Sequence, residues 1–251
     1  NVINENETYD FPYTLEGFSE KFTEYFSKHL GAIDKLIPAA IAIVRWGTNE
    51  CHNELVKVIQ KLCILRIPKK STRSSAEYFH LIAAQLLVHS IGVACIYYEK
   101  YSLLIKLIKT KTLQDYPSCR SDNLFYSASF GIYEDAIRYH KERLISDIIV
   151  DNLFQYYRDV FFSKQEFESC YYAWEYMQSL IIKYYNLDGY SNFIEGKYKN
   201  LFRNILDRSD YYANFVKASI EEKNDWEPLK QGLFDSEYSN YEKLYNELKK
   251  L

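Results

Sequence analysis

The chain has 251 residues, 47% hydrophobic and 26% charged, a balance that excludes a disordered chain and allows a sizeable buried core. With only 8 Gly and 5 Pro, the sequence lacks the turn residues that the many short strands of a β-sandwich or barrel require, whereas long helices need few of them. The formal net charge of −3 neither favours nor excludes a nucleic-acid partner.

The first predicted elements follow a polar start. Residues 1–13 are expected to be a linker at the beginning of a fragment of a longer polypeptide, because the chain starts at Asn rather than Met. A helix is predicted from about Thr14, since apolar side chains then recur on one helix face. The residues on that face are Phe18, Phe22, Tyr25, Phe26 and His29. The apolar run over 36–46 predicts a second helix that ends at Gly47, and a third helix opens at Thr48.

The most hydrophobic stretch of the chain is residues 78–98. Ser74 and Glu77 form a capping box immediately before it. Its length approaches that of a membrane span, but it contains polar residues such as His80 and His89, which are costly at the centre of a bilayer. We therefore predict a buried central helix without a membrane role, in which both histidines are core residues held by hydrogen bonds.

The second half of the chain carries a clear helix start. A long helical region is predicted over 132–162, and Ser163 and Glu166 then form a second capping box. Phe162 and Phe167 have the spacing of a hydrophobic staple, in which the two rings pack against each other around the helix start.

The fold class predicted from these patterns is all-α, either a multi-helix bundle or a short solenoid-like array of helical hairpins. Further helices are predicted over 193–207 and 209–222. Residues 110–124 interrupt the pattern and are the best internal boundary. The chain beyond the linker is therefore expected to be one helical domain, 14–251, or two subdomains, 14–112 and 125–251.

No motif for catalysis or metal binding occurs in the sequence. There is no CxxC, HExxH or glycine-rich phosphate loop, and the neighbours Cys51 and His52 are expected on different helix faces. The cysteines are irregularly spaced and odd in number, which indicates reduced thiols in a cytoplasmic protein. They are Cys51, Cys63, Cys95, Cys119 and Cys170. We accordingly predict no catalytic residue, no cofactor and no metal.

The charges are unevenly distributed, with an acidic head over residues 1–34 and a basic middle over 57–120. Within that middle, residues 57–73 contain no acid. The bases of this segment are Lys57, Lys61, Arg66, Lys69, Lys70 and Arg73. They are candidates for binding phosphate or nucleic acid, and the alternative is a solvated face that pairs with the acidic head.

The C-terminal residues alternate spacings of four and three, as in an a/d stripe along one helix. They are Phe234, Tyr238, Tyr241, Tyr245 and Leu248. An aromatic row of this kind has to be buried, either on the same domain or on a second copy of the chain. The stripe is therefore the candidate interface.

A resemblance to a known domain rests on two segments, GTNECHNELVKVIQKL (47–62) and EYFHLIAAQLLVHSIGVACIYYEKYSLLIKLI (77–108). These segments resemble an uncharacterised helical domain found C-terminal to effector modules in multidomain bacterial proteins. The modules are sirtuin-like, Toll/interleukin-receptor-like or nucleotide-hydrolase domains, several of them linked to phage defence. The resemblance implies that this chain is the regulatory or oligomerising part of its parent, and it transfers no catalytic residue.

The function favoured by the sequence is a non-catalytic interaction, sensor or oligomerisation domain of a larger multidomain protein in bacterial defence. Its partner would be another domain of the same parent or a second copy, in the cytoplasm and away from membranes. The alternative is a helical domain that binds nucleic acid or a nucleotide through residues 57–73. A third possibility is an enzyme whose site is assembled from dispersed residues.

Overall fold

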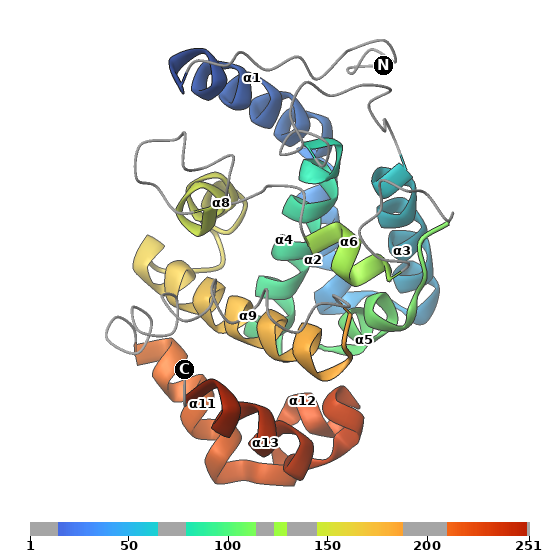
Figure 1. Ribbon diagram of the computed structural model, residues 1–251, viewed down its shortest axis with the longest axis vertical. Coiled ribbons are helices and arrows are strands. Elements are labelled where there is room, and N and C mark those ends of the chain that lie inside the picture. Colours follow the sequence, from blue (N-terminus) through green and yellow to red (C-terminus); the bar gives the residue numbers. More distant parts are fainter. Residues whose placement is uncertain (1–14, 65–78, 114–122, 130–144, 188–209, 250–251) are drawn as a thin grey trace.

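The chain is helical throughout the part that the structure, a computed structural model, describes. That part comprises residues 15–64, 79–113, 123–129, 145–187 and 210–249 (Figure 1). Its only β pairing is an isolated antiparallel bridge between Lys111 and Asn123. The predicted all-α class is therefore confirmed.

The elements before residue 130 are α1 (Leu15–Ile33), α2 (Leu36–Trp46), α3 (Asn49–Ile64), the 3₁₀ turn η2 (Phe79–Leu81), α4 (Ile82–Tyr98), α5 (Ser102–Lys109) and α6 (Leu124–Ser129). Those after it are α8 (Ile145–Leu153), η3 (Phe154–Tyr156), α9 (Lys164–Tyr184), α11 (Asp210–Glu222), η4 (Lys223–Asp225), α12 (Glu227–Lys230), η5 (Leu233–Ser236) and α13 (Tyr238–Lys249). Helix α2 ends at Gly47, as predicted: the N–H of this residue makes the last helical bond, to the carbonyl of Ile43, and its ψ of 148° then turns the backbone out of the helix.

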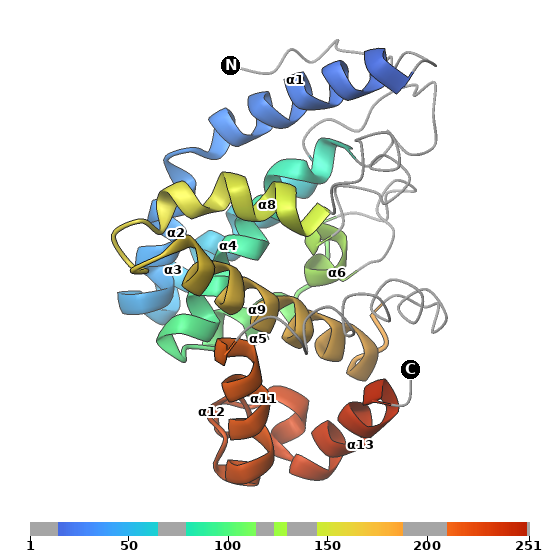
Figure 2. The ribbon, with the colours of Figure 1, turned by 90° about the vertical axis from the view of Figure 1, so that its left-hand side faces the viewer.

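Helix α4 lies at the centre of the fold and contacts α1, α2, α3, α5, α6, α8 and α9 (Figures 1 and 2). Every residue from Ile82 to Ile96 is buried, which is possible only because the helix has no polar stripe. The segment Phe79–Tyr98 is long and apolar enough to cross a membrane, but its side chains are enclosed by the rest of the chain. The prediction of a buried central helix is confirmed.

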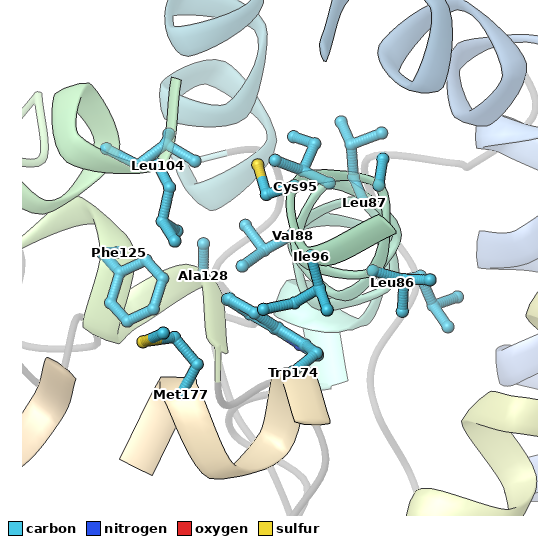
Figure 3. Packing of buried hydrophobic residues seen from close by; sticks show 14 of the residues in the cluster. Leu86, Leu87, Val88, Cys95, Ile96, Leu104, Phe125, Ala128, Trp174 and Met177 are labelled. Carbon is cyan, nitrogen blue, oxygen red and sulfur yellow. The ribbon is translucent and has the colours of Figure 1, made fainter. Parts of the chain in front are cut away.

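Helices α4 and α9 pack closely because a glycine faces the largest side chain of the core. A Cβ atom on Gly92 would overlap the indole ring of Trp174. Figure 3 shows Trp174 and Met177 of α9 beside α4, with Phe125 of α6 on their other side. The indole N–H of Trp174 donates to Nδ1 of His89 over 3.3 Å, so this histidine is a hydrogen-bonded core residue, as predicted.

The start of α9 confirms the second capping box but not the staple. The backbone N–H of Glu166 donates to Oγ of Ser163 over 3.1 Å. In return, the carboxylate of Glu166 accepts the N–H of Phe162 over 2.9 Å. The side chain of Phe162 is fully exposed, and it is Phe161 that packs on Phe167, with ring centroids 5.5 Å apart. The staple prediction was wrong because Phe161, and not Phe162, occupies the place beside Phe167.

The helix predicted over 132–162 is interrupted. Helix α8 ends at Leu153, and the chain passes through η3 and a turn to reach Ser163. The buried hydroxyl of Tyr157 donates to the carbonyl of Ser90 in α4, which ties the turn to the core. The part of this prediction before residue 145, the capping box at 74–77 and the helix at 193–207 lie outside the described residues. The helix predicted over 209–222 corresponds to α11.

The C-terminal stripe does not lie on one continuous helix. Phe234, Asp235 and Ser236 have left-handed backbone angles, with φ of 52°, 55° and 63°, so α13 begins only at Tyr238. Tyr185 holds this turn, because its hydroxyl accepts the N–H of Phe234 over 3.1 Å. The placement of Phe234 on the same helix as the other stripe residues was therefore wrong.

The stripe packs on its own chain. Helices α11 and α13 contact α9, and together with α12 they form the lower part of Figure 1. Phe234 and Tyr241 are buried, while Tyr238 and Tyr245 are half-buried against the same core. The side chain of Leu248 is outside the described residues. One cluster of buried residues runs from α1 to α13, and the division into subdomains 14–112 and 125–251 stays a prediction.

Candidate functional site

A groove between α3 and α5 is the site that best combines a hollow with reactive side chains. Its volume is about 760 Å³. The two helices lie side by side, at the lower right of the α4 core in Figure 1. The lining side chains are Glu50, Asn53, Glu54, Val56, Lys57 and Gln60 of α3, Ser102, Ile105, Lys106 and Lys109 of α5, and Thr110 and Gln231.

The amphipathic patterns of the two helices explain why polar groups line the groove. In α3 the buried residues are His52, Leu55, Val56, Ile59 and Cys63. In α5 they are Leu103, Leu104, Leu107 and Ile108. Burial of these faces against α4 and α6 leaves the charged faces of both helices toward solvent, where they border the groove.

Hydrogen bonds between distant segments hold the two walls in place. The ammonium group of Lys106 donates to the carbonyl of Asn49, over 3.2 Å, and to the side-chain oxygen of Asn53. Gln231 closes the groove from the C-terminal region, since its side-chain oxygen accepts the N–H of Tyr101 and its NH₂ group donates to the carbonyl of Glu99, both over 2.7 Å. The shape of the groove is therefore set by side chains from three parts of the chain.

The groove carries three lysines and two glutamates. Lys57 pairs with Glu54 over 2.7 Å, but both side chains are well exposed, so this pair contributes little to stability. The pKa of Glu50 is lowered, mainly by a hydrogen bond from the side chain of Thr48, with a smaller effect of the Lys106 charge. Lys109 forms no ion pair with the described residues and is available to an anionic ligand.

The structure brings only part of the predicted basic segment to this site. Lys57 lines the groove, and Lys61 is exposed on the same helix. The remaining residues of that segment, Arg66, Lys69, Lys70 and Arg73, lie outside the described residues. Lys106 and Lys109 belong to the basic middle of the chain but were missed as site residues, because only the packing of α5 on α3 places them opposite Lys57.

A serine and a histidine meet at the edge of the groove. The hydroxyl of Ser102 lies 3.5 Å from Nδ1 of His52, which is buried. This contact spans 50 residues of sequence and was not predicted. Burial lowers the pKa of His52, the carbonyl of Ile43 opposes the shift, and the charge of Lys106 adds to it.

We expect the His52 shift to make stability depend on pH. Its pKa in the folded chain lies below the ordinary value of 6.5, so on acidification the unfolded chain takes up a proton first. The free energy of unfolding should therefore fall as the pH drops from about 7 to 5, with a slope for this group of at most about 1.4 kcal/mol per pH unit. Urea titrations should show a smaller slope in His52→Gln. Ser102→Ala, which keeps the imidazole, should retain the slope of the original chain, and an unchanged slope in His52→Gln would contradict the argument.

Cys51 is exposed beside the groove, on a different helix face from His52, as predicted. Hydrogen bonds from the backbone and the side chain of Thr48 lower its pKa. Cys63 and Cys170 are buried, and burial raises the pKa of Cys95.

Because the thiolate is the reactive form, iodoacetamide should label Cys51 first in a Cys119→Ser background. Mass spectrometry should find one fast site, and fast labelling of Cys95 would contradict the burial described here.

No three metal-ligating side chains gather within the described part of the chain. Comparisons with protein-family models, with curated proteins and with solved structures found no match.

Proposed function

We propose that this chain is a non-catalytic binding domain of a larger protein, and that its ligand or partner occupies the groove between α3 and α5. The observation that carries the proposal is the convergence of Lys57, Lys106 and Lys109 on one hollow whose walls are held by hydrogen bonds between distant segments. A preformed concave site of this size with a few directed polar groups is typical of ligand binding.

The contacts of Ser102 favour binding over catalysis. A serine nucleophile needs a base close by, and that base needs a third group that orients it. The Ser102–His52 separation of 3.5 Å is long for such a pair, and no carboxylate among the described residues hydrogen-bonds to His52. The charge that acts on the pKa of this imidazole is the cation of Lys106, which disfavours its protonation.

The groove is a better binding surface than the C-terminal stripe. Tyr241 and Phe234 are already buried in their own chain, so an interface built on them would first require this packing to open. The groove needs no such rearrangement. We therefore assign binding to the groove and a structural role to the stripe.

The wider setting of the domain is also part of the proposal. The two segments that resemble the helical domain of bacterial effector proteins, 47–62 and 77–108, include most of α3 and nearly all of α5, the two walls of the groove. The resemblance supports a cytoplasmic, multidomain parent protein in bacterial defence, in which the groove binds another domain, a second copy or a small ligand. The lysines added by α5 support the nucleic-acid or nucleotide alternative.

A fluorescent reporter on Cys51 tests this proposal in the full chain. In a Cys119→Ser background, an environment-sensitive dye on Cys51 would sit next to Glu50 at the groove wall. The probes are ATP, an oligothymidylate, a poly-glutamate peptide and a concentration series of the unlabelled chain. We expect at least one to give a saturable change in emission that Lys106→Gln together with Lys109→Gln weakens about tenfold or more.

The matched control is Lys217→Gln, which removes an exposed lysine of α11 and should leave the response unchanged. If no probe changes the emission, or if the groove variants respond like the original chain, the groove is not the binding surface and the proposal fails.

A further inference from the structure

An arginine at the end of α2 contacts two aromatic rings. The guanidinium carbon of Arg45 is 4.3 Å from the ring centroid of Trp46 and 4.9 Å from that of Tyr98. Trp46 is 70% exposed, a high value for the largest side chain in proteins. Both Arg45 and Trp46 are free of ion pairs and hydrogen bonds from their side chains to the described residues. These three side chains, Arg45, Trp46 and Tyr98, form a stack.

The stack is held from behind by further aromatic contacts. The ring of Tyr98 packs edge-on against Tyr97, with centroids 5.0 Å apart. Tyr97 in turn packs on Phe161 at 4.6 Å, and its hydroxyl donates to the carbonyl of Val160. The ring of Tyr98 therefore rests on Tyr97, whose own ring and hydroxyl contact the turn before α9.

Two residues of the stack are each followed, four positions later in the sequence, by a residue that lines the groove. Trp46 ends α2 and is followed within four residues by Glu50, which lines the groove. Tyr98 ends α4 and is followed within four residues by Ser102, which also lines it. Figure 2 shows the helices α2, α3 and α5 at the left of the molecule. The ammonium group of Lys106 also donates to the carbonyl of Asn49, which is three residues after Trp46, so this groove lysine reaches the segment that joins the stack to α3.

These groups have complementary binding chemistry. A guanidinium whose faces lie against aromatic rings keeps its N–H groups at the edge, where they can bind a phosphate in bidentate fashion. An exposed indole offers its outer face to a planar base, and such stacking occurs in proteins that bind single strands. Lys106 and Lys109 supply positive charge for further phosphates along the groove. A simple carboxylate ligand would use the cations but leave the indole unused.

We infer that the stack and the groove together bind a nucleoside phosphate, with the base on Trp46 and the phosphates on Arg45, Lys106 and Lys109. This inference rests on the proposed binding function of the groove and names its ligand class. The same chemistry occurs in a free nucleotide and in single-stranded nucleic acid, so the two sources are separated by experiment.

Tryptophan fluorescence tests the inference directly. Trp174 and Trp226 are buried, so Trp46 is the tryptophan that solvent and ligands can reach. We expect ATP or an oligothymidylate of about ten nucleotides to quench its emission in a saturable way, with an affinity that falls as salt is raised from about 50 mM. Saturation at a lower concentration by the oligonucleotide identifies a single strand as the source, and the reverse order identifies a free nucleotide.

The variants separate the two halves of the site. Arg45→Gln should weaken binding about tenfold or more, and Trp46→Ala should do the same when binding is followed by the Cys51 reporter. Phe162→Ala removes a different exposed aromatic ring and should bind like the original chain. Tripolyphosphate, which has no base, should bind more weakly than ATP and should not quench Trp46.

Three results would overturn the inference. They are no saturable quenching by ATP or the oligonucleotide at about 50 mM salt, equal affinity for tripolyphosphate and ATP, or unchanged binding by Arg45→Gln. If the Cys51 reporter still responds to poly-glutamate or to a second copy, the inference alone fails and the groove remains a binding site. If the reporter responds to nothing, the proposed function fails with it.

Discussion

Replacement of Gly92 by Ala should destabilise this protein by about 3 kcal/mol or more, although alanine is normally the better residue inside a helix. The new methyl group would overlap the indole of Trp174, which is fully buried between α4, α6 and α9. A close-packed core relieves such an overlap only by moving a helix or forcing side chains off their rotamers. Urea titrations followed by circular dichroism would measure the loss.

The matched control is Gly31→Ala in α1, where a Cβ atom would meet nothing within 4 Å. This change should leave stability equal or raise it by about 0.5–1 kcal/mol, because it removes only the entropic cost of glycine. In the double variant with Trp174→Phe, the smaller ring should make the loss from Gly92→Ala less than in the single variant. Equal effects of Gly31→Ala and Gly92→Ala would show that α4 and α9 are not in close contact.

Replacement of Tyr241 by Ala should cost about 3–5 kcal/mol, because its ring fills the centre of the C-terminal helices. The ring lies 4.8 Å from that of Trp226 and 5.9 Å from that of Phe234. Its hydroxyl bonds to that of Tyr176 over 2.8 Å and to that of Ser219, and burial raises the pKa of Tyr241 to about 12. Tyr241→Phe should cost about 1–3 kcal/mol, since it leaves buried hydroxyls without this partner.

Lys243→Ala, an exposed change two residues away, should alter stability by less than about 0.5 kcal/mol. Sedimentation of the same variants decides between the two roles considered for the stripe. We expect Tyr241→Ala to lower the urea midpoint without changing the sedimentation of the folded chain. If it instead converts a dimer to a stable monomer, Tyr241 lies between copies and the packing described here is not its main role.

The sequence was sufficient to predict those helix ends that depend only on interactions between residues a few positions apart. The hydrogen bond between Ser163 and Glu166 needs only residues three positions apart, so its motif was sufficient. The end of α2 at Gly47 is local in the same way. The staple failed because it requires a choice between Phe161 and Phe162, and that choice depends on where the rest of α9 packs.

The candidate site was predictable only in part. Lys57 was named because it lies in an acid-free run, whereas Lys106, Lys109 and Gln231 are 49 or more residues away from it along the chain. Arg45 and Tyr98 are separated by 53 positions and carry no motif that would pair them. Sites built from several helices in this way are set by packing, which short-range patterns do not encode.

The sequence by itself determined the helical class and the burial of α4, because the periodicity of apolar residues and the scarcity of turn residues act along the chain. The tertiary structure alone decided that the C-terminal stripe is broken at Phe234, that Tyr241 of the stripe packs on Tyr176 and Trp226, and that α5 supplies one wall of the groove. The physical reason is that several helix faces in this sequence are apolar enough to be buried. Which of them pack against each other is set by the free energy of the whole core and not by that of any one helix.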